Sequence, residues 1–424
     1  MNRPGFAGVL AAALVAAAPA AAIVAPQFMP AVEDVPVDRL IANVTANKDH
    51  LTRSERARAL GRLHLLAYLR HSRRLPVTYR NPSDRGTPAV IDNNISTCVT
   101  LRPGAEPPGH DDVCGTMTYY NSPRPEIPPL RGALPPPDRE LALATDAYKT
   151  ARAIDPGNLR TRIALAFVLV RAGRAGEALV ELRFAAKAGL QAARSGTGDR
   201  RQFNEWNSGV VLREIVAELT PLARRPADVA LALRLKQAAA KAPDVTIMTP
   251  ILVPLTEDTD FAHLIDRHSP AAFDFTGQGL ILRAGWPTPK AAWLVWDPQH
   301  RDRITSGFQL FGSATWVASW DNGYSPLGAL DDNGDGRLTG PELDGLALWA
   351  DADGDGISEP GEVVPVRQAG IAALRYDYAA MGPDGAVSPA GVTFADGRTA
   401  PTYDWTISSA DLVRVRDTRT EPVP

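Results

Sequence analysis

Cysteine, methionine and histidine are scarce in this 424-residue chain, which contains two, five and seven of them. Two cysteines are too few for a disulfide-rich scaffold or a four-cysteine zinc site. The 45 basic and 48 acidic residues leave a net charge of −3, so there is no basic excess that would indicate a nucleic-acid partner. The sequence also lacks GxSxG, HExxH, a P-loop and GxGxxG after a strand. We therefore expect neither nucleic-acid binding nor catalysis.

The N-terminus has the layout of a secretory signal peptide. Arg3 is followed by an alanine-rich apolar run at 5–25, and small residues at 20–22 form a cleavage site. We interpret residues 1–25 as a signal peptide, which makes the mature protein secreted or periplasmic, without a stable membrane span. Retention of this segment as a membrane anchor is the alternative. No other apolar run in the sequence is long enough to cross a bilayer.

The two cysteines, Cys98 and Cys114, lie in a stretch rich in proline and glycine. Outside the cytoplasm, we expect them to form one disulfide that closes a short loop. A metal site that also uses His110 is the alternative, although the spacing matches no zinc pattern.

The region from 33 to 242 has the apolar spacing of α-helices. Ala144, Tyr148 and Ala151 lie at helical spacing ahead of Asp155-Pro156, an order that resembles part of a tetratricopeptide repeat. The resemblance implies paired helices that form a groove for an unidentified protein partner. The other expected divisions are a long insertion at 72–136, a proline-rich linker at 243–259, a calcium-binding α+β domain at 260–410 and a tail at 411–424.

Two twelve-residue segments near the C-terminus match the calcium-loop pattern D-x-[DN]-x-[DN]-G-x5-E. They read DDNGDGRLTGPE at 331–342 and DADGDGISEPGE at 351–362. In such loops, side-chain oxygens at alternate positions, one backbone carbonyl and a bidentate glutamate at position twelve surround the ion. The predicted ligands of two Ca²⁺ ions are Asp331, Asn333, Asp335, Arg337, Thr339, Glu342, Asp351, Asp353, Asp355, Ile357, Glu359 and Glu362.

Only residues 343–350 separate the two loops, and Leu343, Leu346, Ala347 and Ala350 have helical spacing there. We expect one short helix that both loops share. Calmodulin-type sensors need two helices whose angle opens on calcium binding, so a single shared helix predicts a permanently filled structural site. The second loop has more acidic ligands, and we expect it to bind Ca²⁺ more tightly. The expected fold class is multidomain: a tetratricopeptide-like α-helical array followed by a small α+β domain with two EF-hand-type calcium loops.

A series of landmarks runs in order through the C-terminal region: FDFTGQG at 273–279, GW at 285–286, LVWD at 294–297, QLFG at 309–312, NG at 322–323 and LALWAD at 346–351. This order is similar to the calcium-binding region of repeats-in-toxin proteins, including their self-processing module. That module cleaves itself at an Asp-Pro bond, where this chain has Ser269-Pro270. Gln299, Arg301 and Phe308 also replace ligands in the loop that begins at Asp297. The resemblance thus implies a calcium domain without self-cleavage.

The whole arrangement looks like uncharacterised secreted or envelope proteins of bacteria. We predict a non-catalytic calcium-binding protein, in which calcium stabilises the C-terminal domain and the helices dock a protein partner. The alternative is a calcium-stabilised envelope hydrolase acting on polysaccharide or cell wall, with acids among Asp274, Asp297 and Asp302. A weaker reading is calcium-dependent adhesion. We expect a core, rather than a sugar-stacking surface, from the cluster of Trp286, Trp293, Trp296, Trp316 and Trp320.

Overall fold

The structure is a computed structural model, and it describes residues 35–46, 50–70, 138–194, 209–242, 248–275, 282–318, 320–381 and 384–407. The predicted signal peptide, the insertion at 72–136 and the tail lie outside these described residues. Cys98 and Cys114 belong to that insertion, so their pairing also stays a prediction. None of the described helices is long and apolar enough to cross a membrane.

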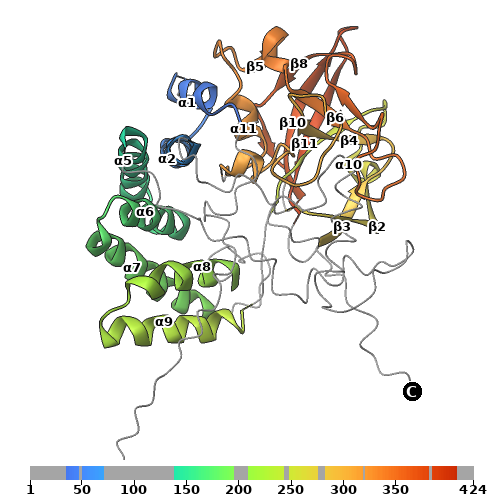
Figure 1. Ribbon diagram of the computed structural model, residues 1–424. Coiled ribbons are helices and arrows are strands. Elements are labelled where there is room, and N and C mark those ends of the chain that lie inside the picture. The colour runs from blue at the N-terminus through green and yellow to red at the C-terminus, as the bar shows by residue number, and fades with distance from the viewer. Residues whose placement is uncertain are drawn as a thin grey trace, which may run out of the picture.

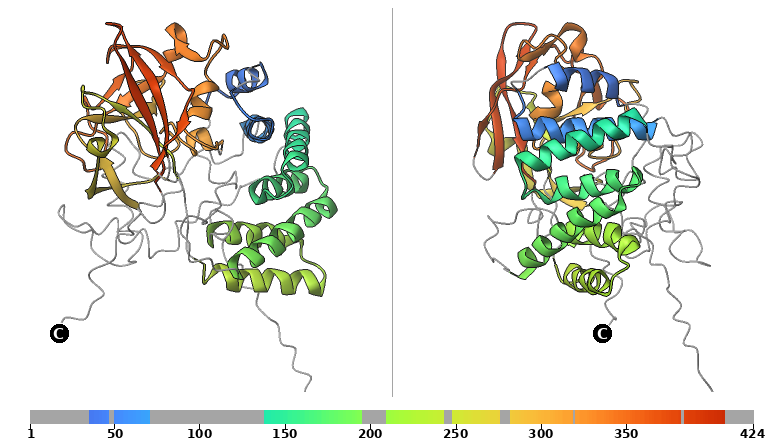
Figure 2. Two further views of the ribbon diagram at one scale, coloured as in Figure 1. Left: turned by 180° about the vertical axis from the view of Figure 1, so that it is seen from behind. Right: turned by 90° about the vertical axis from the view of Figure 1, so that its left-hand side faces the viewer.

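The N-terminal half of the described chain is helical. Its helices are α1 (Val37–Ala46), α2 (Arg53–Arg70), α5 (Arg139–Ile154), α6 (Leu159–Arg171), α7 (Ala175–Arg194), α8 (Gly209–Leu219), which continues into the 3₁₀ turn η5 (Thr220–Leu222), and α9 (Pro226–Ala239). They follow one another as a column beside the C-terminal domain, with α1 and α2 at the end nearest to that domain (Figures 1 and 2).

Local sequence explains where several helices begin and how closely they pack. The side chains of Asp138 and Asn158 accept hydrogen bonds from backbone N–H groups in the first turns of α5 and α6, as N-cap residues do. Gly61 lets α2 approach α5, because a Cβ at this position would lie 2.8 Å from the ring of Tyr148. The buried carboxylate of Glu181 in α7 pairs with Arg162 of α6.

The C-terminal domain is built on one antiparallel sheet. In sheet order, its strands are β5 (Arg337–Thr339), β8 (Ile371–Arg375), β10 (Gly385–Phe394), β11 (Thr399–Trp405), β1 (Ile251–Pro254), β4 (Ala291–Trp296), β6 (Leu346–Trp349) and β7 (Val363–Pro365). Strand β9 (Ala379–Ala380) pairs with β10, outside this order. The sheet curls into a half-barrel (Figure 1).

A separate hairpin and several short helices complete this domain. The hairpin consists of β2 (Ile265–Phe273) and β3 (Leu282–Pro287). The short helical elements are α10 (Phe261–Leu264), η6 (Thr315–Val317), α11 (Tyr324–Gly328) and η7 (Gly340–Leu343). All five tryptophans of the predicted cluster are buried, with exposed fractions of 6% or less, so the prediction that they form a core is confirmed.

The predicted fold class is wrong. The C-terminal domain is a curled antiparallel sheet rather than a small α+β domain with EF-hand-type loops. The described helices that precede it range from 10 to 20 residues and do not repeat a unit of fixed length, so they are no tetratricopeptide array.

The segment between the two calcium loops is a strand and not the expected shared helix. Strand β6 pairs with β4 on one side and β7 on the other, and all four of its residues are buried. Such a strand is apolar on both faces, and over so few residues its pattern cannot be distinguished from a buried helix. Strand β1 lies inside the stretch interpreted as a linker and is a central strand of the sheet.

Candidate calcium centre

The two predicted calcium loops lie at the two ends of the strand order. The first loop follows α11, and its seventh to ninth residues form β5, which pairs with β8. The second loop joins β6 to the edge strand β7. EF-hand loops normally pair with each other, whereas here each loop is attached to the sheet separately.

The first loop is closed by its first and last ligand residues. The buried carboxylate of Asp331 accepts the N–H groups of Gly334 at 2.7 Å and Gly336 at 3.0 Å. The carboxylate of Glu342 accepts the N–H groups of Asp332 at 2.8 Å and Thr339 at 2.9 Å. These bonds hold both ends of the loop around a common centre.

The second loop repeats this arrangement. The carboxylate of Asp351 accepts the N–H groups of Gly354 at 2.8 Å and Gly356 at 2.7 Å. Glu362 accepts the N–H groups of Ala352 at 2.7 Å and Glu359 at 3.0 Å. Two segments that differ at seven of their twelve positions thus adopt the same hydrogen-bonded turn.

Glycines allow the chain to wind in this way. Gly334 and Gly336 have φ angles of 73° and 88°, and Gly354 and Gly356 have 74° and 84°. This left-handed region is costly for residues with a Cβ atom. Both loops therefore need glycine at positions four and six, and Arg337 and Ile357, the predicted carbonyl ligands, come directly after the second of these glycines.

The remaining predicted side-chain ligands follow the same scheme. Asn333 and Asp335 accept the N–H group two residues further on, at 2.8 and 3.2 Å. Asp353 and Asp355 do so at 3.3 and 2.7 Å. Each of these side chains is thereby bent back toward its own loop.

The second loop gathers a dense negative charge. Carboxylate oxygens of Asp351, Asp353 and Asp355 all lie within 4.8 Å of one another. Burial raises the pKa of Asp351 to about 6, and Glu362 adds to this effect. Burial, with Asp353, Glu359 and Glu362 nearby, also raises the pKa of Asp355. A divalent cation with a preference for oxygen ligands would offset this repulsion, so the residues present fit Ca²⁺.

Aromatic residues distant in sequence support the first acid of each loop, and the ligand prediction did not include them. The Tyr376 hydroxyl donates to Asp331 at 2.6 Å, and the Trp286 indole N–H donates to Asp351 at 2.7 Å. Burial and the bond to Asp331 raise the pKa of Tyr376, so its hydroxyl keeps the proton that it donates. Trp286 belongs to the GW landmark, while nothing in the local sequence marks Tyr376.

A third loop has a related backbone turn without the ligands. The Asp297 carboxylate accepts the N–H groups of Arg301 and Asp302, both at 3.0 Å. His300 and Asp302, at positions four and six, have positive φ angles of 49° and 53°. The Arg301 guanidinium donates to the side chain of Gln299, so a cation occupies a position where calcium loops place an acid. Because backbone groups engage both of its carboxylate oxygens, Asp297 has a structural role here.

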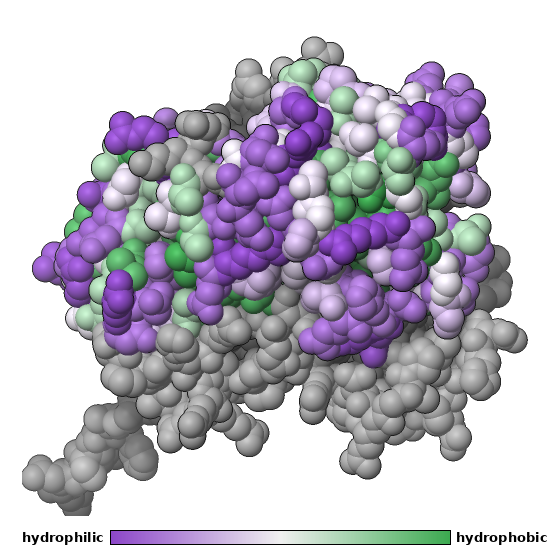
Figure 3. Space-filling view, turned by 90° about the horizontal axis from the view of Figure 1, so that it is seen from above, coloured by the Kyte–Doolittle hydropathy of each residue, from purple (hydrophilic) through white to green (hydrophobic). Residues whose placement is uncertain are grey.

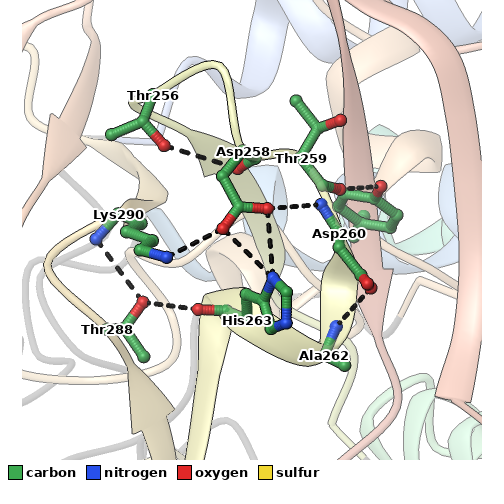
Figure 4. A network of polar contacts seen from close by, with 9 residues as sticks. Thr256, Asp258, Thr259, Asp260, Ala262, His263, Thr288 and Lys290 are labelled. Atoms are coloured by element: carbon green, nitrogen blue, oxygen red, sulfur yellow. Dashed lines mark hydrogen bonds and ion pairs between the residues drawn. The ribbon is translucent and has the colours of Figure 1, made fainter.

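A polar network on the surface joins the β1–α10 connection to the turn before β4 (Figure 4). The Asp258 carboxylate accepts from Lys290 at 2.8 Å and contacts His263 Nδ1 at 3.1 Å. The hydrogen bonds from Lys290 and His263 lower the pKa of Asp258 to about 2. The Thr256 hydroxyl donates to the backbone carbonyl of Asp258 and not to His263. The network therefore connects two loops rather than forming a nucleophile–histidine–acid triad.

Comparison with known proteins gives a matching family model and a partly similar relative. A family model described as SPM domain matches residues 255–407, a segment that contains both calcium loops and every strand from β2 to β11. Iron-regulated protein FrpA of Neisseria meningitidis serogroup C is 33% identical over 113 residues. These residues are 26% of this chain and 10% of that relative, so the chain covers only a small part of its length.

Proposed function

We propose that this protein is a non-catalytic calcium-binding protein in which two Ca²⁺ ions stabilise the C-terminal β domain. The observation that carries the proposal is the repeated turn: in both loops, the first acid accepts two glycine N–H groups and the last glutamate reaches back to the second residue. The acid cluster of the second loop supports the same proposal.

The position of the loops indicates what the ions would do. Strands β5 and β7 are short, and they end the strand order of the sheet. In each loop, the ligands come from both sides of the turn, so a bound ion would hold the residues before the turn to those after it. Calcium would thereby fix β5 and β7, each of which pairs with a single neighbouring strand.

The signal peptide predicted at 1–25 would deliver the protein to the periplasm or the exterior. Extracellular calcium modules bind with dissociation constants of about 0.1–1 mM. We expect affinities of this order, with the second loop the tighter because it has more carboxylates.

We further propose that the helical region docks a protein partner. Large apolar side chains are exposed on α7 and α9: Val180 and Phe184 with exposed fractions of 57% and 42%, and Val229 and Leu233 with 43% and 56%. Each pair is separated by four residues, so its members share one face of their helix. Contiguous exposed apolar patches mark protein-binding surfaces, and we expect these four side chains to contribute to one.

Titration calorimetry tests the calcium proposal directly. We expect two ions per chain, one fewer at millimolar calcium for either Glu342→Gln or Glu362→Gln, and an unchanged count for Glu257→Gln, an exposed control outside both loops. Absence of calcium binding by the parent chain at millimolar concentrations would refute the proposal. If either glutamine variant kept both sites at parental affinity, the ligand assignment would be wrong.

A further inference from the structure

Helix α1 binds directly to the first calcium loop. Arg39 donates to the carboxylate of Asp332 at 2.8 Å and to the carbonyl of Leu330 at 2.7 Å. The amide of Asn43 donates to the same Asp332 oxygen at 2.8 Å and to the carbonyl of Ala329 at 3.0 Å. Asn43 is buried, so its hydrogen bonds have no solvent to replace them.

Asp332 lies between the loop and the helix. It is the second residue of the loop, a position that supplies no calcium ligand in the pattern, and its carboxylate is therefore available to α1. Its backbone N–H donates to Glu342, the predicted bidentate ligand that closes the loop. One residue thus contacts the closing ligand through its backbone and the helix through its side chain.

A second contact reaches the same loop from the segment between α1 and α2. The ring of His50 packs edge-on against the ring of Tyr376, with 5.6 Å between their centroids. Tyr376 in turn donates to Asp331, the first ligand residue of the loop. One intermediate residue, Tyr376 or Asp332, therefore links each end of the first loop to the N-terminal region.

The second loop contacts a different part of the molecule. Its first acid, Asp351, accepts from Trp286 of β3. Its Gly356 lies against β2, since a Cβ there would come within 2.5 Å of the Ala272 carbonyl oxygen. The second loop is thus attached to the β2–β3 hairpin.

We propose that the two calcium ions have separate structural tasks: the ion in the first loop holds the N-terminal helices on the β domain, and the ion in the second holds the β2–β3 hairpin. This inference rests on the proposed calcium binding. Hydrophilic side chains cover the middle of the upper face of the molecule (Figure 3). Loss of the first ion would then free α1 while the hairpin stays in place.

Hydrogen exchange of the full chain in millimolar calcium tests this division. In Glu342→Gln, we expect the amides of α1 to exchange at least tenfold faster than in the parent, with those of β2 and β3 changed less than twofold. Glu362→Gln should show the reverse. Because coupling is reciprocal, Arg39→Met should also weaken calcium binding at the first loop and leave the second unchanged.

The outcomes separate this inference from the function on which it rests. If calorimetry shows two bound ions but both glutamine variants expose α1 and the hairpin equally, separate tasks are refuted and calcium binding stands. If α1 exchange is the same in the parent and in Glu342→Gln, the attachment of α1 through this loop is likewise refuted. If the parent binds no calcium, the proposed function fails and this inference fails with it.

Discussion

Gly356 and Gly336 occupy the sixth position of their loops and offer a matched pair of substitutions. Their φ angles are 84° and 88°, so an alanine at either position must adopt the same left-handed conformation. Their surroundings differ. A Cβ at Gly356 would lie 2.5 Å from the carbonyl oxygen of Ala272 in β2, whereas a Cβ at Gly336 would have no atom within 4 Å. The pair therefore separates backbone strain from a steric clash with the hairpin.

The expected decreases in the free energy of unfolding follow from the backbone strain and the steric clash. Left-handed backbone costs a residue with a Cβ atom about 1–2 kcal/mol, and this is the whole expected effect of Gly336→Ala. In Gly356→Ala, the hairpin must also move away, and displacement of packed backbone adds about 1–3 kcal/mol. We therefore expect Gly356→Ala to lower the free energy of unfolding by roughly 2–5 kcal/mol in total.

Urea unfolding followed by tryptophan fluorescence measures the decrease in stability of both variants, because the buried tryptophans of this domain become exposed when it unfolds. Unfolding in chelator shows the effect on the chain alone, and unfolding in excess calcium adds any effect on ion binding. Equal losses for the two variants in chelator would refute the close approach of the loop to β2. A loss for Gly356→Ala in calcium alone would mean that the substitution acts on metal affinity rather than on packing.

Two further predictions concern single buried groups. Trp286→Phe removes the N–H donor to Asp351. We expect calorimetry to show about tenfold weaker calcium binding at the second loop and unchanged binding at the first. An unchanged affinity of the second loop would contradict the supporting role of the indole. Burial raises the pKa of Asp404 to about 8 from an ordinary value of 3.8, so the folded chain keeps a proton that the unfolded chain has released. Stability should thus fall as pH rises from about 4 to 8, and Asp404→Asn should gain up to about 5 kcal/mol over the parent across this window in denaturant unfolding. Parallel pH profiles for the two proteins would argue that the Asp404 carboxyl is already ionised when folded.

Local patterns in the sequence predict local structure well in this chain. The short apolar run Ala291–Trp296, which contains two tryptophans, forms β4, as expected for a strand buried on both faces. The left-handed glycines of both loops lie where the pattern requires them. These features depend on neighbouring residues, and neighbouring residues are what a sequence shows directly.

Contacts between distant segments could not be predicted in this way. Strand β1 is paired with β4 and β11, and the prolines around it instead indicated a linker. Arg39 lies far before the first loop in the sequence, and Tyr376 lies after it. Both side chains contact that loop, and neither belongs to a motif. Their roles follow from the way the sheet curls, which no short segment specifies.

The three loops show how little the calcium pattern says about the fold around it. The pattern at 331–342 and 351–362 specifies a turn, yet it does not specify the helices that flank such turns in EF-hands. Here burial decides the flanks, since Leu346–Trp349 is enclosed between β4 and β7 and forms a strand. The loop at Asp297 shows the converse: the turn persists with Gln299 and Arg301 at ligand positions, because backbone N–H groups satisfy Asp297 without an ion. Such a turn therefore does not require an ion, and we expect the side chains at the alternate positions to decide whether a metal binds.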